Sequence, residues 1–235
     1  MNGQNLSKEF LYQGFALIVS IILVHAFYVS IVRPEATSII QEQQAMIEQD
    51  INYVPERSFY VIVRDFEQES CFILMLWAFA IMTLKAQSSI NERRLLQEDL
   101  VPVREGQSIS PNETNDFLRQ LENLPDSKKD LLLPRILRNG LQRFATTKNV
   151  QDVSTSTHTM VESEADRLES ELSMIRYIAW AIPSIGFIGT VRGIGAALSL
   201  AHRAVDGDIS GVTQNLGVAF NSTFIALLIS IVIMF

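Results

Sequence analysis

Four long stretches of apolar residues stand out along this chain, and their lengths predict membrane-spanning helices. The first, residues 10–32, runs for 23 residues without Lys, Arg, Asp or Glu. At about 1.5 Å per residue it is long enough to cross a hydrocarbon core of roughly 30 Å. A signal peptide would have a shorter apolar region that ends in small residues, whereas Tyr28, Ile31 and Arg33 close this one. We interpret it as a retained transmembrane helix.

The other three stretches carry more polar residues. The second, residues 70–84, reaches a spanning length only if its helix begins near Phe59, which adds charges at Arg64, Asp65, Glu67 and Glu69. The third, residues 175–201, holds Arg176, Arg192, Pro183 and four glycines, and the fourth, residues 216–235, is uncharged. The sequence therefore predicts an all-α, polytopic membrane protein with four transmembrane helices and a helical cytoplasmic region.

The distribution of basic residues predicts the orientation. The polar stretch of residues 85–176 holds 13 of the 19 Lys and Arg residues, and the positive-inside rule places such a stretch in the cytoplasm, with both termini on the same side. The predicted segments are an N-terminal segment with the first transmembrane helix (1–33), an external loop (34–57), the second transmembrane helix (58–85), the cytoplasmic helical region (86–174) and the third and fourth transmembrane helices (175–235).

Local signals predict helices within the cytoplasmic region. Residues 110–113 form a capping box with proline at the first helical position, and residues 131–144 are apolar at helical spacing, with Pro134 as a start or kink. A proline-free segment from about Val150 to Pro183 predicts that the third transmembrane helix begins well inside the cytoplasm. One helix presents a basic set, which suits either a solvated face or a cytoplasmic protein partner: Arg135, Arg138 and Arg143.

Composition and motifs argue against several classes of function. Cys71 is the single cysteine, and the three histidines lie far apart, so we expect no metal site. The net charge of -7 gives no reason to expect direct nucleic-acid binding. Motifs of serine hydrolases, P-loop proteins and zinc proteases are absent from the sequence. We expect neither an enzyme nor a bound cofactor.

Small residues in the third apolar run predict close helix packing. Gly189 and Gly193 form a GxxxG pair, and Gly186 with Thr190 repeats the small-xxx-small spacing. Such spacing lets helix backbones approach closely in lipid, where packing replaces the hydrophobic effect. The seam belongs either inside one subunit or between subunits.

Polar residues inside the same two helices suggest a route for ions. Thr190 lies in the third run and Thr223 in the fourth, with Asn221 and Ser222 beside the latter. A single hydroxyl in hydrocarbon usually bonds a carbonyl of its own helix. Two at corresponding depths on neighbouring antiparallel helices are also suited to line a narrow path for ions or protons.

The charges near the membrane raise two further questions. Neither the third nor the fourth run contains a carboxylate, which a proton or cation path normally needs. Asp65, Glu67 and Glu69 lie at the outer end of their helix, so we favour a carboxylate from another chain. Arg192 and Glu69 lie at equal predicted depth. Arg192 therefore pairs with Glu69, Glu67 or Asp65, or extends to the outer headgroups.

Two segments resemble the MotA/TolQ/ExbB proton-channel family: IPSIGFIGTVRGIG at residues 182–195 and NLGVAFNSTFIALLISI at residues 215–231. The resemblance implies that Thr190 and Thr223 line the ion path and that Pro183 lies at its cytoplasmic mouth. Four crossings are similar to the MotA branch, whereas the G-T-V core is closer to TolQ and ExbB. Arg192 stands where the family usually has an apolar residue.

The resemblance also implies a partner and an assembly. Five copies would surround a dimer of a single-span protein similar to MotB, TolR or ExbD in the bacterial inner membrane, and the partner's aspartate would carry H+ or Na+. The motor would drive motility, outer-membrane energisation or anti-phage defence, and we expect the natural chain to continue beyond Phe235. The alternative is a passive membrane scaffold or signalling protein whose helical cytoplasmic region binds a partner.

Overall fold

Every secondary-structure element in the part of the chain that the structure describes is a helix. This computed structural model describes residues 3–49, 53, 56–103, 109–110, 113–205 and 207–235. The chain divides into two compact units, which we call the membrane unit (residues 1–82 and 174–235) and the polar unit (residues 83–173). Within the described ranges, four helical stretches are long and apolar enough to cross a membrane. The predicted all-α fold with four candidate spans is confirmed.

The first span is longer than the sequence suggested. α1 (Gly3–Phe27), the π-helix η1 (Tyr28–Val32) and α2 (Arg33–Gln49) follow one another without a break. Much of the segment predicted as an external loop, residues 34–57, is therefore helix. Pro34 has no N–H and would interrupt a regular α-helix. In η1 the Arg33 N–H bonds the Tyr28 carbonyl, five residues back, and this wider turn lets the helix continue past the proline.

The second span is broken near its start. A short helix, α3 (Phe59–Val63), ends before Arg64 and Asp65, and α4 (Phe66–Leu95) begins after them. The prediction of one continuous helix over residues 58–85 is wrong in this respect. Glu67 and Glu69 fall in the first turn of α4, where the positive end of the helix dipole stabilises carboxylates. The acidic residues therefore sit at a helix start rather than within a span.

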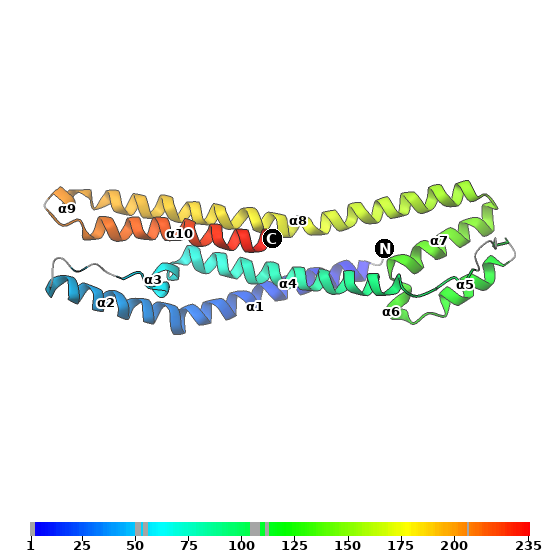
Figure 1. The fold of residues 1–235 in the computed structure, drawn as a ribbon, viewed down its shortest axis with the longest axis horizontal. Coiled ribbons are helices and arrows are strands. Elements are labelled where there is room, and N and C mark those ends of the chain that lie inside the picture. Colours follow the sequence, from blue (N-terminus) through cyan, green and yellow to red (C-terminus); the bar gives the residue numbers. More distant parts are fainter. Residues whose placement is uncertain (1–2, 50–52, 54–55, 104–108, 111–112, 206) are drawn as a thin grey trace. The chain divides into compact units, whose positions relative to one another are not determined.

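The third and fourth spans agree closely with the sequence. α8 (Val150–Ser199) starts at the predicted residue and continues for 50 residues, about 75 Å of helix. α9 (Ala201–Val205) and the following turn connect it to α10 (Ser210–Met234). Figure 1 shows α10 running back alongside the end of α8. The two helices are therefore antiparallel neighbours, as expected.

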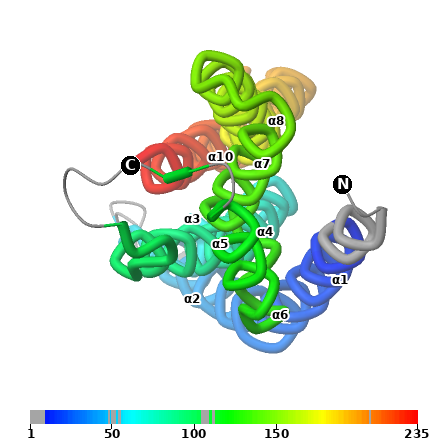
Figure 2. Tube along the Cα trace, turned by 90° about the vertical axis from the view of Figure 1, so that its right-hand side faces the viewer, coloured from blue at the N-terminus to red at the C-terminus, as the bar shows by residue number. Residues whose placement is uncertain are grey.

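In the membrane unit, α4 is the central helix. Viewed along the bundle, α8 and α10 lie side by side, and α4 lies between that pair and α1 (Figure 2). Its buried residues Cys71, Ala78 and Ile81 belong to one apolar core with residues of α8 and α10. The core is thin. Large apolar side chains point outward from several helices, for example Phe15, Phe187 and Phe224 at 67%, 65% and 55% exposure, as expected for a multi-pass protein in lipid.

The polar unit contains three further helices after α4: α5 (Thr114–Glu122), α6 (Asp126–Lys129) and α7 (Leu132–Thr147). At the predicted capping box, the Ser110 N–H donates to Glu113 Oε2 at 2.9 Å, whereas the proline of that motif lies outside the described residues. The Leu132 N–H that opens α7 donates to the Glu92 carboxylate at 2.9 and 3.0 Å. Pro134 therefore marks a helix start, as predicted.

Within the same unit, one carboxylate joins α7 to α8. Glu164 is buried and accepts hydrogen bonds from Arg135 at 2.7 Å and from Arg167 at 2.9 Å. Burial opposes ionisation, but the hydrogen bond and charge of Arg135, together with Arg167, hold the pKa of Glu164 below its ordinary value. Arg135 thus has an internal partner, and a cytoplasmic partner for this basic helix stays a prediction.

Candidate functional site

The three glycines of the predicted seam form a contact inside the subunit. All three are buried on the face of α8 that meets α10. An added Cβ at Gly193 would lie 2.8 Å from the backbone nitrogen of Ala219, and one at Gly189 would lie 2.7 Å from Ser222 Oγ. The facing pairs are Gly186 with Ala226, Gly189 with Ser222, and Gly193 with Ala219. Here the absence of side chains brings two helix backbones together.

The two predicted threonines meet across this seam. Thr190 Oγ1 and Thr223 Oγ1 are hydrogen-bonded to each other. Thr190 Oγ1 also lies 3.0 Å from the carbonyl oxygen of Ala219 on α10, and Thr223 Oγ1 lies 3.1 Å from that of Gly186 on α8. Because each hydroxyl has one proton, one of them donates to the other while the other donates to a carbonyl. A hydroxyl within a membrane helix usually bonds only a carbonyl of its own helix, and Thr190 and Thr223 depart from that pattern.

Of the two polar residues that precede Thr223, Ser222 lies at the seam and Asn221 does not. Ser222 is buried, with 1% of its surface exposed, and its hydroxyl donates to the Val218 carbonyl at 2.9 Å. Asn221 is half-buried, and two residues along an α-helix correspond to a rotation of about 200°. Asn221 therefore faces away from the side of α10 that carries Thr223. The structure brings Ser222 to the seam and does not bring Asn221 there.

Pro183 lies inside α8, and its missing N–H leaves the carbonyl of Ala179 without its usual helical donor. The hydroxyl of Ser230, on α10, donates to that carbonyl at 3.3 Å. The proline is thus compensated from the neighbouring helix, by a residue that lies about two turns along α10 from Thr223. The sequence analysis did not identify Ser230, because no local sequence pattern indicates that a serine in one transmembrane helix bonds a backbone carbonyl of another.

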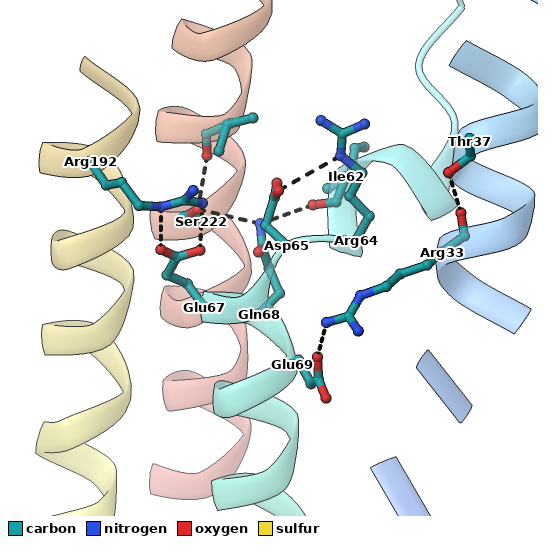
Figure 3. A network of polar contacts seen from close by, with 11 residues as sticks. Arg33, Thr37, Ile62, Arg64, Asp65, Glu67, Gln68, Glu69, Arg192 and Ser222 are labelled. Atoms are coloured by element: carbon teal, nitrogen blue, oxygen red, sulfur yellow. Dashed lines mark hydrogen bonds and ion pairs between the residues drawn. The ribbon is translucent and has the colours of Figure 1, made fainter. Parts of the chain in front are cut away.

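Arg192 forms an ion pair with one of the three predicted carboxylates, Glu67. The guanidinium donates to both oxygens of this carboxylate, Nε at 2.6 Å and Nη2 at 2.9 Å (Figure 3). Of the three candidates, Glu69 and Asp65 are not its partners. Asp65 has the Nε of Arg64 at 3.7 Å. The bidentate geometry is the strong form of an arginine–carboxylate contact.

Glu69 instead joins the first span. Its Oε1 lies 2.7 Å from His25 Nδ1, and its Oε2 accepts a hydrogen bond from Arg33. Residues eight apart in a regular α-helix differ by about 80°. The wider π-turn η1 between His25 and Arg33 absorbs one extra residue, so both side chains reach the same carboxylate. The Arg33 guanidinium also lies 4.4 Å from the ring centre of Phe66.

A polar residue that the sequence analysis did not single out links α4 to the seam. Gln68 is fully buried, and its Nε2 donates to the carbonyl of Ile62 at 3.1 Å and to Ser222 Oγ at 3.4 Å. Because Gln68 lies between Glu67 and Glu69, the sequence alone suggests that it is part of a solvent-exposed polar patch. Among the described residues, no group of His, Cys, Asp and Glu is arranged to hold a metal ion.

Comparison with known proteins identifies the family. The model of the MotA/TolQ/ExbB proton channel family matches residues 128–235, a range that contains the glycine seam, Pro183 and the threonine pair. The search of curated proteins and that of solved structures found no match. The matching family consists of membrane channel proteins and not of enzymes. Residues 128–235 of this chain are thus a channel-type region of the MotA/TolQ/ExbB proton channel family.

Proposed function

We propose that this chain is the stator subunit of an ion-driven rotary motor in the bacterial inner membrane. It would convert the flow of H+ or Na+ into mechanical work together with a single-span partner similar to MotB, TolR or ExbD. Five copies would surround a dimer of the partner, with both termini of each copy in the cytoplasm. The driven process would be motility, outer-membrane energisation or anti-phage defence.

The observation that carries this proposal is the Thr190–Thr223 pair. Two hydroxyls in contact with each other and with backbone carbonyls of both helices form a polar step within an otherwise apolar seam. Hydroxyl and carbonyl oxygens are suitable ligands for a passing cation or its water. The glycines let α8 and α10 pack so closely that the hydroxyls of Thr190 and Thr223 come into contact.

A partner is needed because the seam has no carboxylate of its own. The parts of α8 and α10 that would cross the membrane contain no Asp or Glu, and the acidic residues of α4 that reach toward α8 and α1 are paired with arginines. A cation at the membrane centre requires a countercharge. An aspartate from a single-span partner, moving past the threonine pair, would supply it.

The first test is the composition of the complex. The chain would be expressed with the product of the adjacent gene, purified through a tag on this chain, and analysed by native mass spectrometry. We expect five copies with two copies of a single-span protein that carries a membrane aspartate. A homo-oligomer without such a protein would contradict the motor and favour the scaffold alternative.

The second test concerns the hydroxyls. Thr190→Val keeps the volume of the side chain and removes its hydroxyl, whereas Thr190→Ser keeps the hydroxyl. We expect Val to abolish ion flux in the purified complex and Ser to retain it, with unchanged assembly of both. Thr213→Val is the matched control, because Thr213 is exposed and bonds only carbonyls of its own chain segment. Equal flux in Thr190→Val and the control would refute the assignment.

A further inference from the structure

The first span bends at the π-helix η1, and an open hollow lies on its surface at this bend. Figure 1 shows α1 and α2 inclined to each other on either side of η1, and prolines and π-turns are common causes of such bends. The hollow has a volume of about 520 Å³ and is lined by Val29, Arg33, Pro34, Thr37, Ser38 and Gln41. Single π-turns occur frequently at functional sites, so we examined what this hollow could bind.

The hollow lies at the predicted outer boundary of the membrane. The apolar run of the first span ends at Val32, and Arg33 follows directly. Thr37 and Gln41 lie about 6 Å and 12 Å further along α2. The headgroup layer of a bilayer extends roughly 5–7 Å beyond each side of the hydrocarbon core. Arg33, Thr37 and Ser38 therefore lie at the depth of phospholipid phosphates.

The lining of the hollow offers hydrogen-bond donors. The Arg33 guanidinium is held in place by Glu69, which accepts from Nη2, and by the Phe66 ring, whose centre lies 4.4 Å away. Its side chain is 29% exposed, and within the described part of the chain Nε and Nη1 make no hydrogen bond. Ser38 and Gln41 are exposed, and their side chains have no partner among the described residues. Guanidinium, hydroxyl and amide groups are suitable donors to phosphate oxygens.

The charges at the hollow favour hydrogen bonding over net attraction. Among the described residues, those that line the hollow include no carboxylate, and Arg33 is the charged one. Figure 3 shows its guanidinium turned toward Glu69 on α4, and that carboxylate offsets much of its charge. A ligand is therefore held by directed bonds to its phosphate oxygens. Anionic and zwitterionic phospholipids share these oxygens and should bind about equally.

Exposed apolar side chains continue from the hollow toward the membrane interior. Val29, at the inner end of the hollow, is 51% exposed, and Ile22 and Ile18 are 60% and 57% exposed. These two lie seven and eleven residues before Val29, within about 20° of it around the helix. From Val29 to Ile18 is about 16 Å of helix, close to the roughly 15 Å depth of one leaflet's hydrocarbon. The strip therefore matches an acyl chain in both length and polarity.

We propose that this hollow binds the phosphodiester of one phospholipid from the outer leaflet. Arg33, Ser38 and Gln41 donate to its oxygens, and one acyl chain lies along Ile22 and Ile18. A water-soluble phosphate ester presents the same oxygens but leaves the apolar strip uncovered. The bound lipid stabilises the bend at the point where Arg33 joins the first span to α4. Such a site is independent of the proposed motor function.

The test compares lipids that share their acyl chains and differ in the phosphate. The purified chain in detergent is titrated with dioleoylphosphatidylglycerol, dioleoylphosphatidylethanolamine or the phosphate-free monogalactosyl-dioleoylglycerol, and bound lipid is counted by native mass spectrometry. We expect one copy of either phospholipid per chain at low lipid fraction, and about tenfold weaker binding of the glycolipid, as for the loss of one charge-assisted hydrogen bond. Equal binding of all three lipids would overturn the phosphodiester site.

Substitutions locate the binding within the hollow. Gln41→Leu should raise the half-saturating phospholipid fraction about threefold to tenfold, as for the loss of one hydrogen bond. Gln44→Leu is the matched control, because Gln44 is also exposed on α2 and does not line the hollow. Arg33→Lys keeps the charge beside Glu69 and loses the planar fork of donors, so it should weaken binding further. If this variant does not fold, Gln41→Leu decides the question, since its side chain makes no contact that the fold needs.

Two results would contradict the inference directly. Equal half-saturation of wild type, Gln41→Leu and Gln44→Leu would show that the retained phospholipid lies elsewhere on the chain. Displacement of the phospholipid by millimolar glycerol 3-phosphate, with binding of that ester to the wild type and not to Arg33→Lys, would assign the hollow to a soluble phosphate ester instead of a lipid. Retention of the phospholipid in the presence of the ester supports the lipid site.

Discussion

The glycine seam predicts that one substitution has different effects at two positions of α8 that lie two residues apart. A Cβ added at Gly193 would lie 2.8 Å from the nitrogen and 2.9 Å from the Cα of Ala219. Carbon atoms prefer separations of about 3.5–4.0 Å, and a backbone cannot turn aside as a side chain can. At Gly195, no atom lies within 4 Å of an added Cβ. Gly193→Ala must separate the two helices, whereas Gly195→Ala meets open space.

The comparison isolates the clash because both substitutions gain the same helix propensity, about 1 kcal/mol. Relieving the Gly193 contact requires α8 and α10 to separate by about 1 Å, and overpacking of this kind costs about 1–3 kcal/mol. Separation also weakens the bonds of Thr190 and Thr223, each worth about 0.6 kcal/mol in a membrane protein. We expect the free energy of unfolding of Gly193→Ala to be about 2 kcal/mol below that of Gly195→Ala, or roughly 4–8 °C in Tm.

Thermal unfolding of the purified chain in detergent, followed by tryptophan fluorescence, measures this difference. Gly217→Ala serves as a second control, on α10, because an added Cβ there also has no atom within 4 Å. Both control variants should melt at or slightly above the temperature of the wild type. If Gly193→Ala melts at or above Gly195→Ala, the close contact of the two backbones does not exist as described.

Three other predictions follow from contacts outside the seam. In a double-mutant cycle with Arg192→Gln and Glu67→Gln, unfolding should reveal a coupling of about 1 kcal/mol, and zero coupling would refute the pair. Ser230→Ala should destabilise the wild-type chain by about 1 kcal/mol. In the Pro183→Ala variant, where the missing N–H is restored, the same substitution should cost much less. Equal costs in the two backgrounds would show that Ser230 does not replace the donor lost at Pro183. The lowered pKa of Glu164 means that its stabilisation is fully present above the ordinary glutamate value of 4.5 and is lost as the pH falls through the folded value. The Tm difference between wild type and Glu164→Gln should therefore shrink on acidification, and a difference that does not change with pH would contradict this.

Much of the membrane unit could be predicted because its signals are local. Span length follows from a fixed rise per residue, and the small-residue spacing of Gly186, Gly189 and Gly193 follows from the helical repeat. The same repeat placed Thr190 on the face that the glycines bury. The extension of the first span past Pro34 was missed, since it depends on one π-turn that no sequence pattern announced.

The partner of Arg192 depends on the direction in which each carboxylate faces as well as on its depth along the helix. Counting residues from the inner flank placed Arg192 level with Glu69, yet the structure pairs it with Glu67. Two residues change the depth by only about 3 Å but turn the side chain by about 200°. Glu67 consequently faces α8, and Glu69 faces the first span. The sequence limited the candidates to three neighbouring carboxylates and could not choose among them.

The sequence by itself determined the four spans, the glycine and threonine positions, and the family to which they belong, because each depends on periodicity within one helix or on a short motif. Only the tertiary structure decided which helices face each other. It placed Ser230 at the carbonyl freed by Pro183 and enclosed Gln68 beside Ser222. Those contacts join residues far apart in the chain, and their geometry depends on how whole helices are rotated and packed against one another.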